Sequence, residues 1–181
     1  MSRLLVPVAI VMSLTGAAHA EDAALLPVGA AAPEVEGKDP TGAFVKLSTE
    51  LKKGPGRFAV VYFYPKDETP GCTKEACAFR DVFDRFVKAG VTIFAVSRDP
   101  EPSHKTFREH HKLPFPMVSD VSGAVQRAYH VPAKGPAGDL AARVTFLVGP
   151  DGKIAKVWPN VDPGVNATEV LDAVAALKTK R

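Results

Sequence analysis

Residues 58–79 read FAVVYFYPKDETPGCTKEACAF, and three patterns follow one another within them. The first seven residues are a continuous apolar run rich in β-forming side chains, which is typical of a strand buried on both faces. Pro65 ends this strand, and a Pro-Gly turn follows it. From Thr73 to Ala89 apolar residues recur every three or four positions, which predicts a single amphipathic helix closed by Gly90.

The chain continues to alternate between strand and helix patterns on the C-terminal side. Residues 91–97 predict a second buried strand, and residues 103–111 a helix with Ser103 as its N-cap. Further along, residues 115–118 predict an extended stretch and residues 123–129 a short helix. Residues 143–148 and 153–158 predict two strands joined by a turn, and residues 168–177 predict a closing helix capped by Thr168.

The N-terminal side reads differently, because residues 21–43 are rich in Ala, Pro and Gly and predict an extended segment with a turn at residues 39–42.

Strands that alternate with helices and then form a hairpin predict an α/β fold, with a central mixed sheet flanked by helices on both faces. The sequence contains no internal repeat and no linker long enough to divide it.

The composition is that of an ordinary globular protein. The chain has 181 residues, of which 46% are hydrophobic and 24% charged. This length favours one domain with a core of its own. The formal net charge is +3, and Lys and Arg form no cluster, so no nucleic-acid partner is predicted.

The first twenty residues predict a signal peptide. A short cationic start is followed by the mostly apolar residues 4–14 and by Ala18-His19-Ala20, which has the A-x-A pattern of a cleavage site. The apolar run is too short for a stable membrane span. We therefore expect export to the periplasm or beyond, cleavage before Glu21, and a mature domain of residues 21–181 that has no membrane partner after cleavage. The alternative is that the segment stays attached as an uncleaved anchor.

Cys72 has the sequence context of a reactive thiol. It follows a strand and a Pro-Gly turn and lies in the first turn of the predicted helix. Unpaired N–H groups and the positive end of the helix dipole meet there, and both favour a thiolate. Pro65 and Pro70 stiffen the loop, and Thr69 is close enough for its hydroxyl to bind the sulfur or an incoming oxygen.

Cys77 is the second of only two cysteines. In an intact helix the Cα atoms of residues five apart are ~8.7 Å from each other, beyond the ~7 Å limit for a disulfide. A Cys72–Cys77 disulfide therefore requires the start of the helix to unwind. The spacing also allows a static disulfide in an oxidising compartment, without catalysis. The C-x-x-C motif of thioredoxin-like proteins is absent.

No metal site or cofactor is predicted. The two cysteines show no recognised metal-ligand spacing with the scattered histidines of the expected mature domain, which are His104, His110, His111 and His130. His110 and His111, near a helix end, are interpreted as a solvated surface. Asp67 and Glu75 could tune Cys72, but charged residues beside an exposed turn are more often solvated.

Residues 63–81 closely resemble the peroxiredoxin Q (bacterioferritin comigratory protein) branch of the peroxiredoxins. They contain the P-x-x-x-T-x-x-C pattern of that family as Pro65, Thr69 and Cys72. The similarity covers roughly residues 26–177 and includes Val96-Ser-Arg-Asp99, Leu113-Pro-Phe-Pro116 and Arg143-Val-Thr-Phe-Leu147. It implies a thioredoxin-like fold with an N-terminal extension, and thiol-dependent reduction of hydrogen peroxide and organic hydroperoxides.

The resemblance also implies a role for each residue of the site. Cys72 would be the peroxidatic cysteine and Cys77 the resolving cysteine. Thr69 would bind peroxide, Pro65 would shield the pocket, and Arg143 would stabilise the thiolate and polarise the O–O bond. A guanidinium suits that role, because its donors can follow charge that develops on the leaving oxygen.

The chain departs from the family at several points. Asn166 stands where relatives often have a histidine, and residues 132–139 match poorly. Export would require an exported thioredoxin-like dithiol as reductant, and family habit favours a monomer. Two other functions use the same cysteines: a thiol–disulfide oxidoreductase acting on proteins, and a non-catalytic thioredoxin-fold binding module with a structural disulfide.

Overall fold

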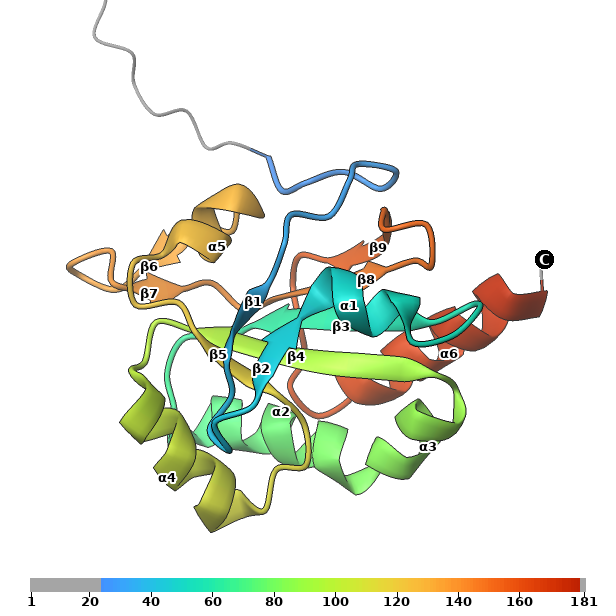
Figure 1. Cartoon of the computed structure of the whole chain (residues 1–181). Helices are drawn as coiled ribbons and strands as arrows, with labels where there is room; N and C mark the ends of the chain where they lie inside the picture. Colours follow the sequence, from blue (N-terminus) through green and yellow to red (C-terminus); the bar gives the residue numbers. More distant parts are fainter. Residues whose placement is uncertain (1–23, 180–181) are drawn as a thin grey trace, which may run out of the picture.

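The computed structural model describes residues 24–179 (Figure 1). The main sheet of this part of the chain has the strand order β5-β4-β3-β8-β9. β3, β4 and β5 are parallel, whereas β8 and β9 add to the sheet in antiparallel fashion. The predicted mixed sheet is thereby confirmed, with the strands β3 (Phe58–Phe63), β4 (Val91–Ser97), β5 (Met117–Ser119), β8 (Val144–Val148) and β9 (Ile154–Trp158).

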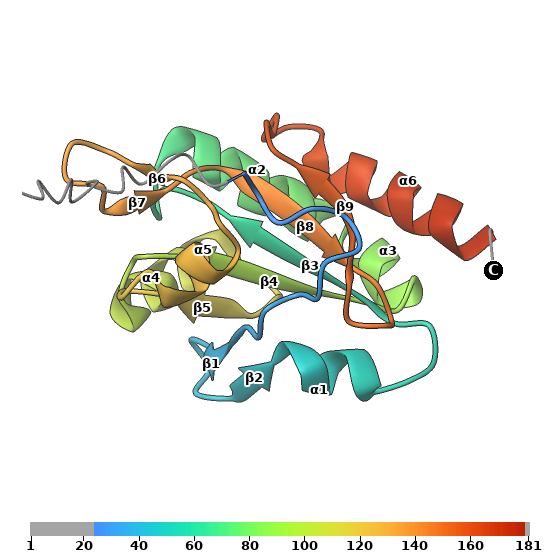
Figure 2. The ribbon, with the colours of Figure 1, turned by 90° about the horizontal axis from the view of Figure 1, so that it is seen from above.

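Helices cover one face of the sheet. In Figure 1 the ribbons of α2 to α4 lie below it, and Figure 2 shows α6 beside α2. The bounds of these helices are α2 (Pro70–Asp81), α3 (Phe83–Lys88), α4 (Glu101–His111) and α6 (Asn166–Thr179). Phe79 of α2 stacks on Tyr62 of β3 with ring centroids 4.9 Å apart, and both are fully buried.

The N-terminal segment and α5 (Ala124–Ala128) cover the opposite face. In Figure 2 the N-terminal hairpin and the helix after it lie across the sheet from α2 and α6. This segment consists of β1 (Glu36–Lys38), β2 (Phe44–Lys46) and α1 (Leu47–Lys52). A second small hairpin is formed by β6 (Ala133–Lys134), which lies within the poorly matching residues 132–139, and β7 (Leu140–Ala141), which follows them directly.

β3 is buried on both faces, as its apolar run predicts. Phe58, Val60 and Tyr62 belong to the core beneath α2 and α6, and the alternate residues belong to the core on the other side. This division follows from the two-residue period of a strand. The turn predicted at residues 39–42 is also confirmed: Asp39 accepts hydrogen bonds from the N–H groups of Thr41 and Ala43.

The single helix predicted for residues 73–89 is wrong. α2 ends at Asp81, and α3 begins at Phe83 after a non-helical residue, Val82. The break lets Phe79 and Phe86 both reach the core, where each is fully buried. The apolar residues keep their helical spacing across the break at Val82, so the sequence pattern does not reveal the break.

The two predicted helix caps are wrong as well. α4 begins at Glu101, with Pro100 as its N-cap and Pro102 in its first turn. Proline suits that turn, because its missing N–H has no partner there in any case. Ser103 lies inside the helix instead, and α6 begins at Asn166, before Thr168.

The predicted signal peptide, residues 1–20, lies outside the described residues. Among the helices of residues 24–179, none combines the length and the hydropathy that a membrane span requires.

Candidate active site

Cys72 lies in the first turn of α2, as the sequence predicts, although the helix begins earlier than expected, at Pro70. Thr69 is the N-cap residue, and Cys72 is only 1% exposed. Helix N–H groups that lack intrahelical partners and the helix dipole both favour negative charge at this position. The sulfur of Cys72 thus lies at the positive end of α2.

Arg143 contacts that sulfur directly, because its Nη2 donates a hydrogen bond to the Sγ of Cys72 at 3.2 Å. The sheet explains the meeting: Phe63 pairs with Val144, so the end of β3 and the start of β8 share one edge. The cysteine loop follows β3, and Arg143 immediately precedes β8. Gly71 leaves room for the guanidinium, since a Cβ there would lie 3.2 Å from Nη2.

Glu75 completes a cluster of three side chains. It is fully buried, and Nη1 of Arg143 donates a hydrogen bond to its Oε2. Burial raises the pKa of Glu75 to about 7, against the opposing effect of the Arg143 guanidinium. One guanidinium therefore bridges a buried carboxyl group and the sulfur of Cys72.

The interpretation of Glu75 as a solvated residue is wrong. Glu75 follows Cys72 by three residues, and residues three apart share one face of a helix. The spacing therefore indicates that Glu75 and Cys72 lie on the same side of α2. It does not indicate that Arg143, from a distant part of the sequence, contacts both of them.

Thr69 and Pro65 lie on the loop between β3 and α2. The hydroxyl of Thr69 donates a hydrogen bond to the carbonyl oxygen of Lys66 at 2.9 Å rather than to the sulfur of Cys72. Its donor is thus occupied, whereas its lone pairs can still accept a hydrogen bond. Pro65 and Arg143 both line a pocket of about 710 Å³, together with the apolar side chains of Leu25, Pro132, Val144 and Val161.

Cys77 is half-buried, and both cysteines carry free thiols in this structure. α2 is continuous from Pro70 to Asp81 and contains both residues. The helix therefore holds the two cysteines at the separation that excludes a disulfide, which matches the geometric expectation.

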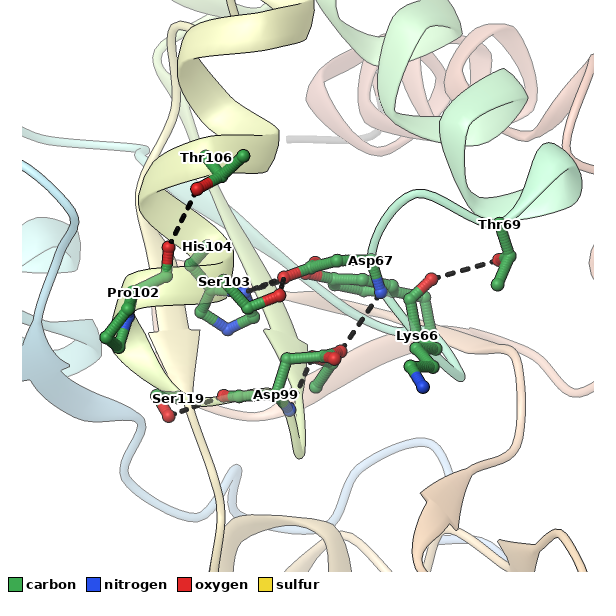
Figure 3. A network of polar contacts seen from close by, with 11 residues as sticks. Lys66, Asp67, Thr69, Asp99, Pro102, Ser103, His104, Thr106 and Ser119 are labelled. Carbon is green, nitrogen blue, oxygen red and sulfur yellow. Dashed lines mark hydrogen bonds and ion pairs between the residues drawn. The ribbon is translucent and has the colours of Figure 1, made fainter.

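A buried polar network anchors the loop that leads to Cys72 (Figure 3). Asp67 accepts hydrogen bonds from the hydroxyls of Tyr64 and Ser103, each at 2.7 Å, and also pairs with Nδ1 of His104 at 2.9 Å. Its own N–H binds the carboxylate of Asp99 at 3.0 Å. The network thus ties the loop to α4 and to the end of β4.

The expectation that Asp67 is solvated is wrong, because the residue is only 5% exposed. Burial alone would raise the pKa of Asp67, but the hydrogen bonds from His104, Ser103 and Tyr64 together hold it below its usual value. Asp67 is therefore a buried carboxylate that fixes the loop. Most of its partners lie far away in the sequence, so no local pattern reveals them.

Asn166 is fully buried at the start of α6, and its Oδ1 accepts a hydrogen bond from the hydroxyl of Thr145 at 2.9 Å. This hydrogen bond joins α6 to β8 at Thr145, which lies two residues after Arg143.

The fold and this site define a class: thioredoxin-like α/β proteins with a cysteine held at a helix start by an arginine. Residues 28–157 match the family model of the AhpC/TSA family, and the chain belongs to that family.

Relatives place it in the peroxiredoxin Q branch. The chain is 44% identical over 132 residues to peroxiredoxin Q, chloroplastic, of rice (Oryza sativa subsp. japonica); the match covers 73% of this chain and 58% of the relative. The chain thus spans somewhat more than half the length of that relative.

Solved structures agree with this placement. Peroxidoxin BcpB from Mycobacterium tuberculosis is similar with a TM-score of 0.74 and 31% identity, covering 83% of this chain and 97% of that protein. The bacterioferritin comigratory protein of Xanthomonas campestris, described by its alkyl peroxide reduction activity, is similar with a TM-score of 0.70 and 36% identity. That match covers 79% of this chain and 91% of the other. The expected thioredoxin-like fold is thereby confirmed.

Proposed function

We propose that this protein is a thiol peroxidase that reduces hydrogen peroxide and organic hydroperoxides, with Cys72 as the peroxidatic cysteine. The observation that supports it best is the contact between Arg143 Nη2 and Cys72 Sγ at the start of α2. Family membership supports the same chemistry. The pocket beside Arg143 has a largely apolar lining, to which Lys134, Asn160 and Asp162 add polar groups. The apolar part of this lining suits the hydrocarbon part of an organic hydroperoxide, and the Xanthomonas relative is described as reducing alkyl peroxides.

The first step is attack of the Cys72 thiolate on the terminal oxygen of the peroxide. An S–O bond forms as the O–O bond breaks, which leaves a sulfenic acid and an alkoxide or hydroxide that takes up a proton from solvent. The Arg143 guanidinium donates toward the charge that develops on the leaving oxygen. Thr69 accepts a hydrogen bond from the peroxide through the lone pairs of its hydroxyl oxygen, and Pro65 shields the pocket.

The second step is condensation with Cys77. Its thiol attacks the sulfenic sulfur, an S–S bond forms, and the oxygen leaves as water. Because the intact helix holds the two cysteines too far apart, the first turns of α2 must unwind for this step. A dithiol partner then restores both thiols by exchange and becomes a disulfide itself.

The proposal includes a cellular location and a partner. Residues 1–20 act as a cleavable signal peptide, and residues 21–181 form one exported domain that works as a monomer. An exported thioredoxin-like dithiol serves as the reductant. Mass spectrometry of the protein expressed in a bacterium tests the cleavage site, because the proposal requires Glu21 as the first residue.

The decisive experiment is stopped-flow measurement of thiol loss in the reduced protein mixed with one equivalent of hydrogen peroxide. The same protein in denaturant gives the rate of an unactivated cysteine. Loss of two thiols per chain, faster than that baseline by orders of magnitude, supports an activated Cys72 and resolution by Cys77. Loss at the baseline rate contradicts the proposal and favours exchange with protein disulfides instead. Cys72→Ser must abolish the fast phase.

A further inference from the structure

A cluster of metal-ligating side chains lies outside the cysteine site. Oε1 of Glu68 is 3.2 Å from Nδ1 of His110, and its Oε2 is 3.0 Å from Nε2 of His111. One ligand atom from each residue can be chosen so that all lie within 4.8 Å of one another. Two imidazoles and one carboxylate are a donor set typical of zinc.

The loop side of this cluster is held in place by the backbone. Glu68 has a φ of 58°, in the left-handed region that residues other than glycine rarely adopt. Its neighbour Asp67 is fixed to Ser103 and His104 of α4, as Figure 3 shows. The same loop is therefore already bound to the helix that supplies the two histidines.

The helix side is held as well. The ring of His111 lies edge-on to Phe107, with centroids 5.1 Å apart, and its side chain is only 17% exposed. The carbonyl oxygen of His111 accepts a hydrogen bond from Nη1 of Arg80 at 2.8 Å. His110 is open to solvent, with 67% of its side chain exposed, so an ion can enter from that side.

The charge of the cluster suits a cation. Glu68 supplies the negative charge, because a solvent-accessible glutamate side chain is a carboxylate at neutral pH. The described residues thus present a carboxylate between two imidazoles, and unprotonated imidazole is the form of histidine that binds metals.

We propose that Glu68, His110 and His111 bind a divalent transition-metal ion of the zinc class, with water at the remaining position. Tetrahedral ligands with bonds of ~2.0 Å lie about 3.3 Å from one another, close to the separations of the glutamate from each histidine. The ion bridges the loop before Cys72 and the end of α4. This inference does not depend on the peroxidase proposal.

Zinc titration by calorimetry tests the site. The protein carries Cys72→Ser and Cys77→Ser, because free thiolates are themselves zinc ligands. We expect one zinc ion per chain. His110→Ala and His111→Ala should each weaken binding at least about tenfold, since each removes a direct ligand. The matched control is His130→Asn, which changes another exposed histidine and keeps a residue that tolerates its positive φ.

Each outcome decides the proposal. Equal zinc affinity in the His110→Ala and His130→Asn proteins would place the ion elsewhere and overturn it, and so would the absence of saturable binding below ~1 mM zinc. His110 is exposed, so its replacement leaves the fold intact, which circular dichroism checks. Cobalt(II) added to the protein with both cysteines gives a further test: a thiolate-to-cobalt charge-transfer band that accounts for the bound ion contradicts the proposed ligands.

Discussion

Nη2 of Arg143 lies 3.2 Å from the sulfur of Cys72, while Nη1 of the same guanidinium binds the buried carboxyl group of Glu75. The side chain cannot move toward one partner without changing its contact with the other. Its position over the sulfur is thus fixed by a residue about one helical turn further along α2.

Replacing Arg143 should slow the reaction with peroxide while leaving the fold in place. Arg143→Ala removes both the contact with the thiolate and the donor for the leaving oxygen, and loss of such a donor costs about 10²–10³ in rate. Arg143→Lys should recover only part of the rate, because an ammonium cannot reach two partners as a planar fork does. Stopped-flow rates within about threefold of the wild type for Arg143→Ala would refute the role.

Glu75 should make stability depend on pH. Its pKa is about 7 in the folded protein and near 4.5 in the unfolded chain, so the folded state binds the proton more tightly. The resulting stabilisation is fully present below about pH 4.5 and is lost as the pH rises through 7. The ceiling of this change is on the order of 3 kcal/mol.

Glu75→Gln removes that titration. The difference in free energy of unfolding between the wild type and the Glu75→Gln variant should therefore shift between about pH 5 and pH 8, in favour of the variant at the higher pH. Urea denaturation at both pH values measures it. A constant difference would show that Glu75 does not titrate in this range.

Cys77→Ser should leave the first oxidation intact and prevent disulfide formation. Cys72 would then stay as a sulfenic acid and become overoxidised when peroxide is in excess. Mass spectrometry after peroxide treatment should find two added oxygens on the peptide that contains Cys72. If Cys77→Ser instead abolishes the first reaction, the two cysteines have the opposite roles.

Asp67→Asn should destabilise the protein, because the amide cannot accept all the hydrogen bonds that the buried carboxylate receives from Tyr64, Ser103 and His104. We expect a loss of about 1–3 kcal/mol in the free energy of unfolding. Asp81→Asn is the matched control: its side chain is 63% exposed, so its replacement should change stability by no more than about 0.5 kcal/mol. Equal urea midpoints for both variants would show that the network contributes nothing.

Local patterns in the sequence predict the strands well. Residues 58–64 and 91–97 are continuous apolar runs, and the structure buries both strands at the centre of the sheet. The position of Cys72 near a helix start also follows from local signals, since a proline and a glycine precede it. In each case the information lies within a few neighbouring residues.

The contacts of the candidate site, in contrast, depend on pairing between distant parts of the chain. Arg143 meets Cys72 only because β8 runs antiparallel to β3 in one particular register. Local sequence favours a surface arginine at that position, and only the family resemblance indicates its role. Burial of Glu75 and Asp67 depends on the same kind of tertiary contact. No pattern of neighbouring residues carries that information.

Phe79 limits how much of α2 can rearrange. Its ring is stacked on Tyr62 in the fully buried core, only two residues beyond Cys77. Under the proposed cycle, the oxidised protein keeps the end of this helix docked and exposes a short newly irregular segment at its beginning. The two redox states then present different surfaces. A reductant that recognises the irregular segment can bind the oxidised form of the protein selectively. It can then dissociate once the disulfide is reduced and the helix has re-formed.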